Sequence, residues 1–317
     1  MVAYNLVMFI VSCAVLAVCG IFLVKNLSKI ARFLHLSEFV AGFIIMAIST
    51  SLPELFVGIR AALNGIPSLS LGNVIGSNIA DITLVAGIAI IHAKNMKYNN
   101  EHIGKSALWM IALSALPMVL YLIGNQLSRI DGVVLVLVFF AYYYKLSQHK
   151  CKHILKNNIS RWEIVISSAS FVVLLLVLFK TSEYVVDFGS ALALDLSLPP
   201  LLIGLFFLAL GTSMPELVFE TSAMVNRKPD FALGDVIGSV ICNSTLILGV
   251  TAIIMPISAS FMPFITSAIF MITVVSVFAA FIQASSKLTY MFGISLVLLY
   301  VFFIIVELSL KGVVSFA

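Results

Sequence analysis

The stretch AISTSLPEL at residues 47–55 recurs as ALGTSMPEL at residues 209–217, and each copy places a glutamate within a long apolar run. When residues 42–87 are laid on residues 204–249 at a constant offset of 162, 20 of 46 positions are identical without a gap. A shared apolar composition does not bring Thr, Ser, Pro and Glu into register in this way. We therefore infer that the chain contains an internal duplication.

The composition of the chain restricts its class. Of 317 residues, 62% are hydrophobic and 10% are charged, whereas a soluble domain has about 25% charged residues. Such a chain cannot cover its surface with polar groups, which excludes a soluble enzyme. Because a spanning helix needs about 20 apolar residues, we predict an all-α polytopic membrane protein with ten transmembrane helices. They are expected near residues 3–24, 38–63, 69–92, 104–123, 130–146, 162–180, 199–225, 231–254, 261–283 and 289–307.

The duplication and the helix count together predict the topology. Five helices separate equivalent positions of the two copies, so the second copy crosses the membrane in the opposite sense, as in the inverted repeats of secondary transporters. Residues 1–146 then form a first five-helix repeat and residues 162–317 a second, joined by a short loop over 147–161.

The cationic residues predict how the chain is oriented. Connections that follow odd-numbered helices carry 14 of the 18 Lys and Arg residues. By the positive-inside rule these connections, including the loop over 147–161, are cytoplasmic, and both termini lie outside. We expect a multi-pass protein of the cell membrane that contacts lipid and has no nucleic-acid partner.

Glu54 and Glu216 lie in the middle of predicted helices, at equivalent positions of the two copies. An ionised carboxylate at such a depth costs at least about 2.5–3.5 kcal/mol on insertion scales, so something must compensate it. One reading is a protonated carboxyl bonded to a neighbouring helix. Two such residues at symmetric positions, each within T-S-x-P-E, favour a cation site instead.

The residues around each glutamate add oxygen donors. Thr50 and Ser51 precede Glu54 by four and three residues, which places all three on one helix face, and the second copy repeats this spacing. The proline before each glutamate cannot donate to the preceding turn, so main-chain oxygens there can face a ligand. Carboxylate, hydroxyl and carbonyl oxygens are the ligands of hard cations such as Ca²⁺ and Na⁺. The lack of His and Cys argues against zinc or copper.

The second half of each copy reads GNVIGSNIAD at residues 72–81 and GDVIGSVICN at residues 234–243. Ser77 and Asp81 stand one helical turn apart, as do Ser239 and Asn243, and the paired glycines allow close approach of helices. One copy therefore offers a titratable oxygen ligand where the other has a neutral one.

These paired motifs resemble those of the cation/Ca²⁺ exchanger superfamily, most closely its compact prokaryotic Na⁺/Ca²⁺ exchangers. The resemblance implies that the two glutamates bind Ca²⁺, that neighbouring Thr, Ser and Ala add ligands for Na⁺ and Ca²⁺, and that the terminal Asp or Asn lines the site. It also implies alternating access, with helices 3–24 and 162–180 sliding over the core. Carried over, the metal-site residues are Glu54, Thr50, Ser51, Ala47, Ser77 and Asp81 with Glu216, Thr212, Ser213, Ala209, Ser239 and Asn243.

We therefore expect a Na⁺/Ca²⁺ antiporter that works as a monomer, is not an enzyme and needs no cofactor beyond the transported ions. H⁺/Ca²⁺ exchange and a K⁺ requirement remain alternatives, the latter because Asp81 resembles the acidic position of K⁺-dependent relatives. A cation channel and an intramembrane aspartyl protease are remote alternatives. The sequence shows no evident filter loop, which argues against a channel. The residues before Asp235 lack the first glycine of the GxGD motif, which argues against the protease.

Two departures from the family pattern stay open at this point. Relatives often have Asn in the first copy and Asp in the second, whereas this chain has Asp81 and Asn243, so the ligand roles are expected to be exchanged between halves. Glu220 and Asp235 face Gly58 and Asn73 across the duplication. These two carboxylates can line an entrance or vestibule, serve in packing or pair with a basic neighbour, or act as ligands.

Overall fold

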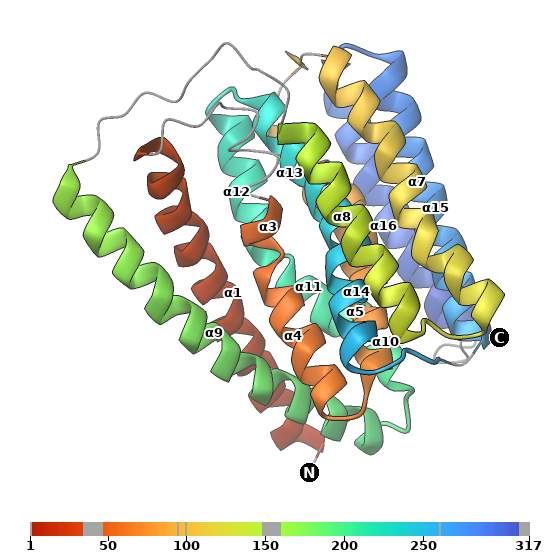
Figure 1. Cartoon of the computed structure of the whole chain (residues 1–317). Coiled ribbons are helices and arrows are strands. Elements are labelled where there is room, and N and C mark those ends of the chain that lie inside the picture. The colour runs from red at the N-terminus through yellow and green to blue at the C-terminus, as the bar shows by residue number, and fades with distance from the viewer. Residues whose placement is uncertain are drawn as a thin grey trace.

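The computed structural model describes residues 2–33, 47–93, 95–98, 100–147, 160–259 and 261–310. Nearly all of these residues are helical (Figure 1). The exceptions include two short strands, β1 (Met96–Lys97) and β2 (Lys287–Leu288), which pair antiparallel. The fold is therefore nearly all-helical, as the composition predicted.

The helices fall into two groups by continuity. Long uninterrupted helices are α1 (Val2–Phe33), α7 (Asn100–Gly124), α8 (Arg129–Ser147), α9 (Arg161–Asp195), α15 (Phe261–Ala284) and α16 (Tyr290–Leu310). Among the described residues, four further helices are broken or distorted along their length. In the first half of the chain these are α3 (Ala47–Thr50) followed by α4 (Leu52–Leu63), and α5 (Pro67–Ala80) followed by the π-helical turn η2 (Asp81–Val85) and α6 (Ala86–Ala93). In the second half they are α10 (Pro200–Ile203) followed by the π-helical turn η3 (Gly204–Leu208), α11 (Ala209–Thr212) and α12 (Met214–Val225), and α13 (Pro229–Cys242) followed by the π-helical turn η4 (Asn243–Ile247) and α14 (Leu248–Ile254). The duplicated motifs lie in the second group.

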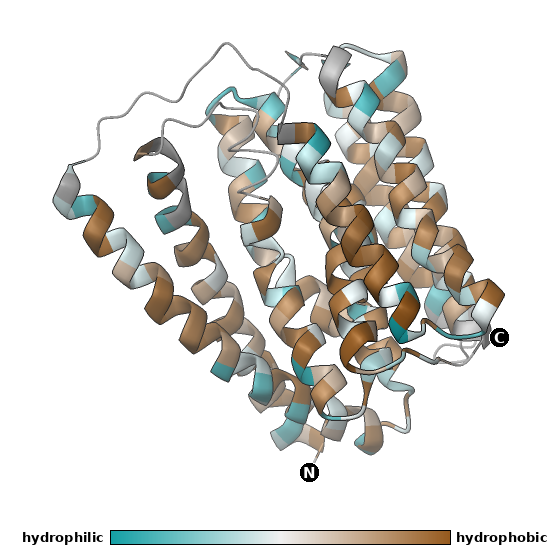
Figure 2. Ribbon diagram, viewed as in Figure 1, coloured by the Kyte–Doolittle hydropathy of each residue, from teal (hydrophilic) through white to brown (hydrophobic). Residues whose placement is uncertain are grey.

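Seven helices in the described part of the chain are long and apolar enough to cross a membrane, or eight if the bent pair Pro200–Thr212 and Met214–Val225 is one span. Of the predicted helix over 38–63, residues 38–46 lie outside the described residues, as does most of the predicted loop over 147–161. Figure 2 shows apolar residues along the length of the outer helices, with polar residues mainly toward their ends. The chain is thus a membrane protein with several apolar spans.

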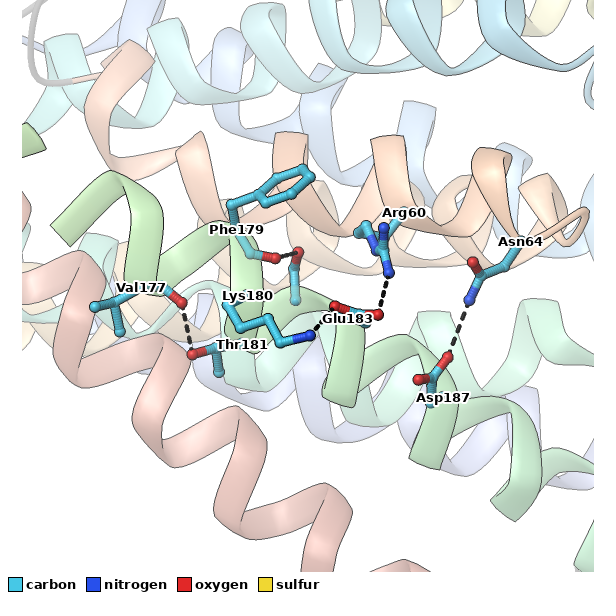
Figure 3. Close-up of polar contacts among 9 residues, drawn as sticks. Arg60, Asn64, Val177, Phe179, Lys180, Thr181, Glu183 and Asp187 are labelled. Carbon is cyan, nitrogen blue, oxygen red and sulfur yellow. Dashed lines mark hydrogen bonds and ion pairs between the residues drawn. The ribbon is translucent and has the colours of Figure 1, made fainter. Parts of the chain in front are cut away.

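The predicted end of the helix at residue 180 is wrong, because α9 continues to Asp195. The apolar run is interrupted by Lys180, Glu183 and Asp187, which mimics a helix end in the sequence. These charges lie at helical spacing: Glu183 pairs with Arg60 on α4 and with Lys180, and Asp187 accepts from Asn64 at the C-cap of α4, so the helix continues through them (Figure 3). The start of α9 is capped, since the Ser160 hydroxyl accepts from the backbone N–H of Glu163 and the Glu163 carboxylate accepts from that of Ser160.

The arrangement places the duplicated motifs at the centre. Along one flank α1 and α9 lie side by side, and α7 and α15 pack together on the opposite flank (Figure 1). In the apolar 18-residue windows of the spans Pro67–His92 and Pro229–Ile254, 83% and 78% of the window is buried, whereas in that of Trp162–Asp195 only 11% is buried. The second half of each motif therefore lies in the protein interior and α9 at its periphery.

The two halves of the chain pack crosswise through glycine contacts. A Cβ atom at Gly132 on α8 would lie 2.7 Å from the carbonyl oxygen of Gly249 on α14. At the equivalent place, a Cβ atom at Gly293 on α16 would lie 2.8 Å from the carbonyl oxygen of Gly87 on α6. Each half thus contributes one helix that packs directly on the central span of the other half.

Candidate ion-binding site

The helices that carry the two motif glutamates are broken one turn before them. The breaks fall at Ser51, with φ −81° and ψ 4°, and at Ser213, with φ −80° and ψ 6°. Glu54 and Glu216 consequently stand in the first turns of α4 and α12 rather than in mid-helix. The positive end of a helix dipole favours a carboxylate there. Broken helices of this kind form the ion sites of many transporters.

The second halves of the motifs are distorted at matching positions. The π-helical turn η2 begins at Asp81, and η4 begins at Asn243, its equivalent in the duplication. Within these turns, the hydroxyls of Thr83 and Thr245 each donate to the carbonyl four residues earlier. A π-helical turn changes where the following side chains point and is common at functional sites.

Hydroxyl groups join the two halves across the centre. Thr50 Oγ1 and Ser239 Oγ share a hydrogen bond of 3.2 Å. In the other direction, Thr212 Oγ1 and Ser77 Oγ share one of 3.3 Å. Each threonine of a T-S-x-P-E motif therefore contacts the serine of the opposite copy. Four predicted ligand residues are in this way brought together in two matched pairs.

The same two threonines also donate hydrogen bonds to a second pair of residues that are equivalent in the duplication. Thr50 donates to Asp235 Oδ1 at 3.3 Å, and Thr212 donates to Asn73 Oδ1 at 3.2 Å. Asp235 and Asn73 are equivalent in the duplication, but only one of them is a carboxylate. Asp235 therefore lies against the predicted ligand set, and the two halves of the centre differ in charge.

Close helix approach on the first side depends on glycine. A Cβ atom at Gly72 would lie 2.0 Å from the carbonyl oxygen of Leu201, and one at Gly76 would lie 2.2 Å from that of Leu205. Any larger residue would push α5 away from α10 and η3. The glycines predicted to allow close helix packing do so here.

The carboxylates at the centre are sealed from solvent and only partly hydrogen-bonded. Glu54 and Glu216 are 0% exposed. Ser77 donates to Glu54 Oε1 at 3.3 Å, while Glu54 Oε2 and both oxygens of Glu216 form no hydrogen bond with described residues. A buried charged oxygen without a partner is costly. These oxygens are free to coordinate a cation.

No three His, Cys, Asp or Glu side chains among the described residues converge closely enough to hold a metal ion. A cation bound here would therefore need hydroxyl and main-chain oxygens in addition to carboxylates, which suits Ca²⁺ and Na⁺ better than softer metals. All twelve predicted ligand positions are buried, with at most 2% of any of them exposed.

One polar residue at the centre was missed from the sequence. The Asn78 side-chain amide donates to Ser244 Oγ at 2.9 Å, and its carbonyl accepts from the Asn243 amide at 3.2 Å. Its equivalent in the second copy is Val240, so the duplication did not single it out. The signal available in the sequence was an asparagine within a predicted apolar helix, and the structure shows that it is fully buried.

Several known proteins that are similar to this chain are named as exchangers. Residues 4–147 and 166–308 match the family described as Sodium/calcium exchanger protein. The sodium/calcium exchanger MaX1 of Methanosarcina acetivorans is 28% identical over 96% of this chain and 99% of its own length. An uncharacterized membrane protein of Methanocaldococcus jannaschii is 32% identical over 73% of this chain and 76% of its own.

Solved structures agree with this match. The structure of the sodium-calcium exchanger NCX_Mj soaked with Na⁺ and Sr²⁺ superposes with a TM-score of 0.70 at 28% identity, covering 96% of this chain and 99% of that one. The similarity thus extends over the whole fold and includes both halves. The chain belongs to the sodium/calcium exchanger protein family.

Proposed function

We propose that this protein is a secondary active antiporter that exchanges Ca²⁺ for Na⁺ across the cell membrane by alternating access. The observation that carries the proposal is the pair Glu54 and Glu216, two fully buried carboxylates with unpaired oxygens at equivalent positions of a duplicated site. Their two negative charges match the charge of one Ca²⁺ ion. Family membership and the names of the relatives agree with the choice of ions.

In this proposal the ions bind at mid-membrane between the predicted helices 38–63, 69–92, 199–225 and 231–254. The ligands are the twelve residues predicted above, and the crosswise Thr–Ser contacts support their grouping. Ten helices in two inverted five-helix repeats, over 1–146 and 162–317, would provide the two-sided access that exchange requires. The protein would act as a monomer in lipid, with both termini outside and the loop over 147–161 in the cytoplasm.

A K⁺-dependent or H⁺-coupled form of the same exchange is the second candidate. Asp81 favours it, because this residue adds a fully buried carboxyl at the start of η2 where the other half has Asn243. A carboxyl beyond the two that balance Ca²⁺ offers a place for a further cation.

Ion flux in proteoliposomes tests these schemes. Uptake of ⁴⁵Ca²⁺ would be measured under an imposed Na⁺, K⁺ or pH gradient, each alone and in combination. The proposal expects uptake driven by an outward Na⁺ gradient, with none driven by a pH gradient alone. Uptake that follows only the pH gradient would replace it with H⁺/Ca²⁺ exchange, and no uptake under any gradient would refute Ca²⁺ exchange.

A further inference from the structure

The interior of this protein holds more negative charge than one Ca²⁺ ion can balance. Five carboxyl groups near the centre are 0% exposed, namely those of Glu54, Asp81, Glu216, Glu220 and Asp235. Within the described ranges, no Lys, Arg or His is among the buried residues. Charge that compensates these groups must therefore come from bound cations or protons, and Ca²⁺ accounts for only two of the five.

Glu220 is one of three groups in this set, with Glu216 and Asp81, whose two carboxylate oxygens both lack a hydrogen bond with described residues. It lies one turn beyond Glu216 on α12, and neither of its carboxylate oxygens forms a hydrogen bond with described residues. No Lys, Arg or His is buried among the described residues to balance its charge. A buried carboxylate without a hydrogen bond needs a cation or a proton to compensate it.

Asp235 lies on α13, which packs against α12. Its Oδ1 accepts a hydrogen bond from Thr50, and its Oδ2 has no partner among the described residues. Glu220 and Asp235 together therefore present three carboxylate oxygens without hydrogen bonds, with the Thr50 hydroxyl next to Asp235. Being fully buried, neither residue forms an exposed entrance, and no buried basic residue pairs with them among the described residues.

Gly58, the residue equivalent to Glu220 in the first half, has no space around it for a side chain. A Cβ atom at Gly58 would lie 2.8 Å from Thr251 Oγ1 and 2.9 Å from Ser70 Oγ. These two hydroxyls also hydrogen-bond to each other at 3.2 Å. The space is filled by neutral groups that need no counter-charge.

In the second half the large, charged side chain is on α12, and its neighbours are small. At the positions equivalent to Ser70 and Thr251 stand two alanines, Ala232 and Ala89, and both are fully buried. The smaller residues leave room for the longer side chain of Glu220 on α12. The added negative charge thus occurs on one side of the duplication only, where the other side has neutral hydroxyls.

We propose that Glu220 and Asp235 form a second cation site between α12 and α13 that takes a monovalent alkali cation, Na⁺ or K⁺. Glu220, Asp235 and the Thr50 hydroxyl offer fewer oxygen ligands than the roughly six to eight that Ca²⁺ takes, which favours a monovalent cation at this place. This inference extends the proposed exchange, because the cation would balance charge that Ca²⁺ at Glu54 and Glu216 leaves uncompensated.

Direct binding to the purified full-length protein tests the site. Binding of ²²Na⁺ and, separately, ⁸⁶Rb⁺ as a K⁺ substitute would be measured at saturating Ca²⁺, so that the central carboxylates are occupied. We expect the wild-type protein to bind one of the two alkali cations. Glu220→Gln and Asp235→Asn, which keep side-chain shape, should each weaken that binding by about tenfold or more. The isotope that binds identifies the ion.

Glu307→Gln provides the matched control, because Glu307 is another buried carboxylate and lies on α16, hydrogen-bonded to Ser267. It should bind the alkali cation as the wild type does. Alkali binding that is unchanged in both Glu220→Gln and Asp235→Asn overturns the site. So does a wild-type protein that binds neither isotope with Ca²⁺ present, since protons then neutralise these groups. A failure of ⁴⁵Ca²⁺ binding itself would instead count against the proposed exchange.

Discussion

Arg60 on α4 and Glu183 on α9 form an ion pair, with Arg60 Nη2 2.7 Å from Glu183 Oε1 (Figure 3). Lys180 approaches the other carboxylate oxygen of Glu183 at 2.6 Å, and one turn further along α9 Asp187 accepts from the Asn64 amide at 3.0 Å. Since α4 begins with the Glu54 turn, these contacts tie the helix of one motif glutamate to the peripheral helix α9. The equivalent of Arg60 in the second half is Ser222, so this link occurs on one side only.

This link predicts a coupling between Arg60 and Glu183. Arg60→Gln and Glu183→Gln should each lower the unfolding temperature of the purified protein by a few degrees, because each removes the partly buried ion pair that joins α4 to α9, although Glu183 keeps Lys180 as a partner in Arg60→Gln. The double variant should be less destabilised than the sum of the single variants, as a thermal-unfolding double-mutant cycle measures. Asp195→Asn, which alters a contact of α9 with Asn5 near the helix end, serves as the comparison. Strictly additive effects would show that the pair contributes no interaction of its own.

Helix contact at Gly76 predicts a steric defect. Gly76→Ala places a methyl group where the carbonyl oxygen of Leu205 lies 2.2 Å away, so α5 must move. Overpacking of this kind costs about 1–3 kcal/mol of folding free energy, and ⁴⁵Ca²⁺ flux should fall with it. Gly124→Ala is the matched control, because a Cβ atom there would meet nothing within 4 Å. Equal stability of the two variants in thermal unfolding would contradict the packing described here.

The positions of the two motif glutamates are predictable from the sequence, because the duplication aligns each residue of the first copy with its equivalent in the second. Glu54 and Glu216 were identified as equivalent, and both are buried in the first turn after a helix break. The crosswise hydrogen bond between Thr50 and Ser239 was not predictable, because it depends on how α3 packs against α13. The π-helical turn at Asp81 was also missed, because nothing local in the sequence distinguishes it from a regular helix.

The predicted end of α9 is wrong because hydropathy alone cannot show where charged residues find partners in the folded protein. A run of apolar residues ends at Lys180, but the helix continues for a further 15 residues to Asp195. The partners that satisfy Glu183 and Asp187 come from α4, more than a hundred residues earlier in the chain. In α9, the interruption of the hydrophobic run therefore does not mark the helix end, because Glu183 and Asp187 find tertiary partners.

The motif glutamates carry the sharpest functional prediction. Glu54→Gln and Glu216→Gln should each reduce ⁴⁵Ca²⁺ exchange in proteoliposomes to the level of empty liposomes, because each removes a charge that a dehydrated divalent ion requires. Glu163→Gln, an exposed residue at the start of α9, should transport at the wild-type rate. Wild-type transport by either motif variant with correct folding would exclude that residue from the site.

The loop charges predict the orientation of the protein. The chain has four cysteines, at positions 13, 19, 151 and 242. In intact cells, a variant that keeps only Cys151 should be labelled by impermeant thiol reagents only after the membrane is opened, because the surrounding Lys-rich loop is expected in the cytoplasm. A cysteine-free variant carrying Asn125→Cys should instead be labelled from outside. The reverse pattern would invert the topology.

Asp81 and Asn243 provide a test of how charge is distributed at the centre. They occupy equivalent positions, begin η2 and η4 respectively, and are both fully buried. Ionised Glu54 and Glu216 already balance the two charges of Ca²⁺, so Ca²⁺ binding does not require a third carboxylate. We therefore expect Asp81→Asn to retain substantial ⁴⁵Ca²⁺ exchange.

Exchanging the two residues extends this prediction. The Asn243 amide donates to Asn78 at 3.2 Å, so Asn243→Asp would give up one hydrogen bond and place a carboxylate against the Asn78 carbonyl. Combined with Asp81→Asn, it keeps one acidic and one neutral member of the pair, and we expect exchange to continue with at most a changed dependence on pH or K⁺. Flux in proteoliposomes between about pH 6 and pH 9, with and without K⁺, measures this difference. Complete loss of exchange in correctly folded Asp81→Asn would show instead that Asp81 must carry a charge or hold a coupled cation directly, because the substitution preserves its shape and most of its hydrogen-bonding capacity.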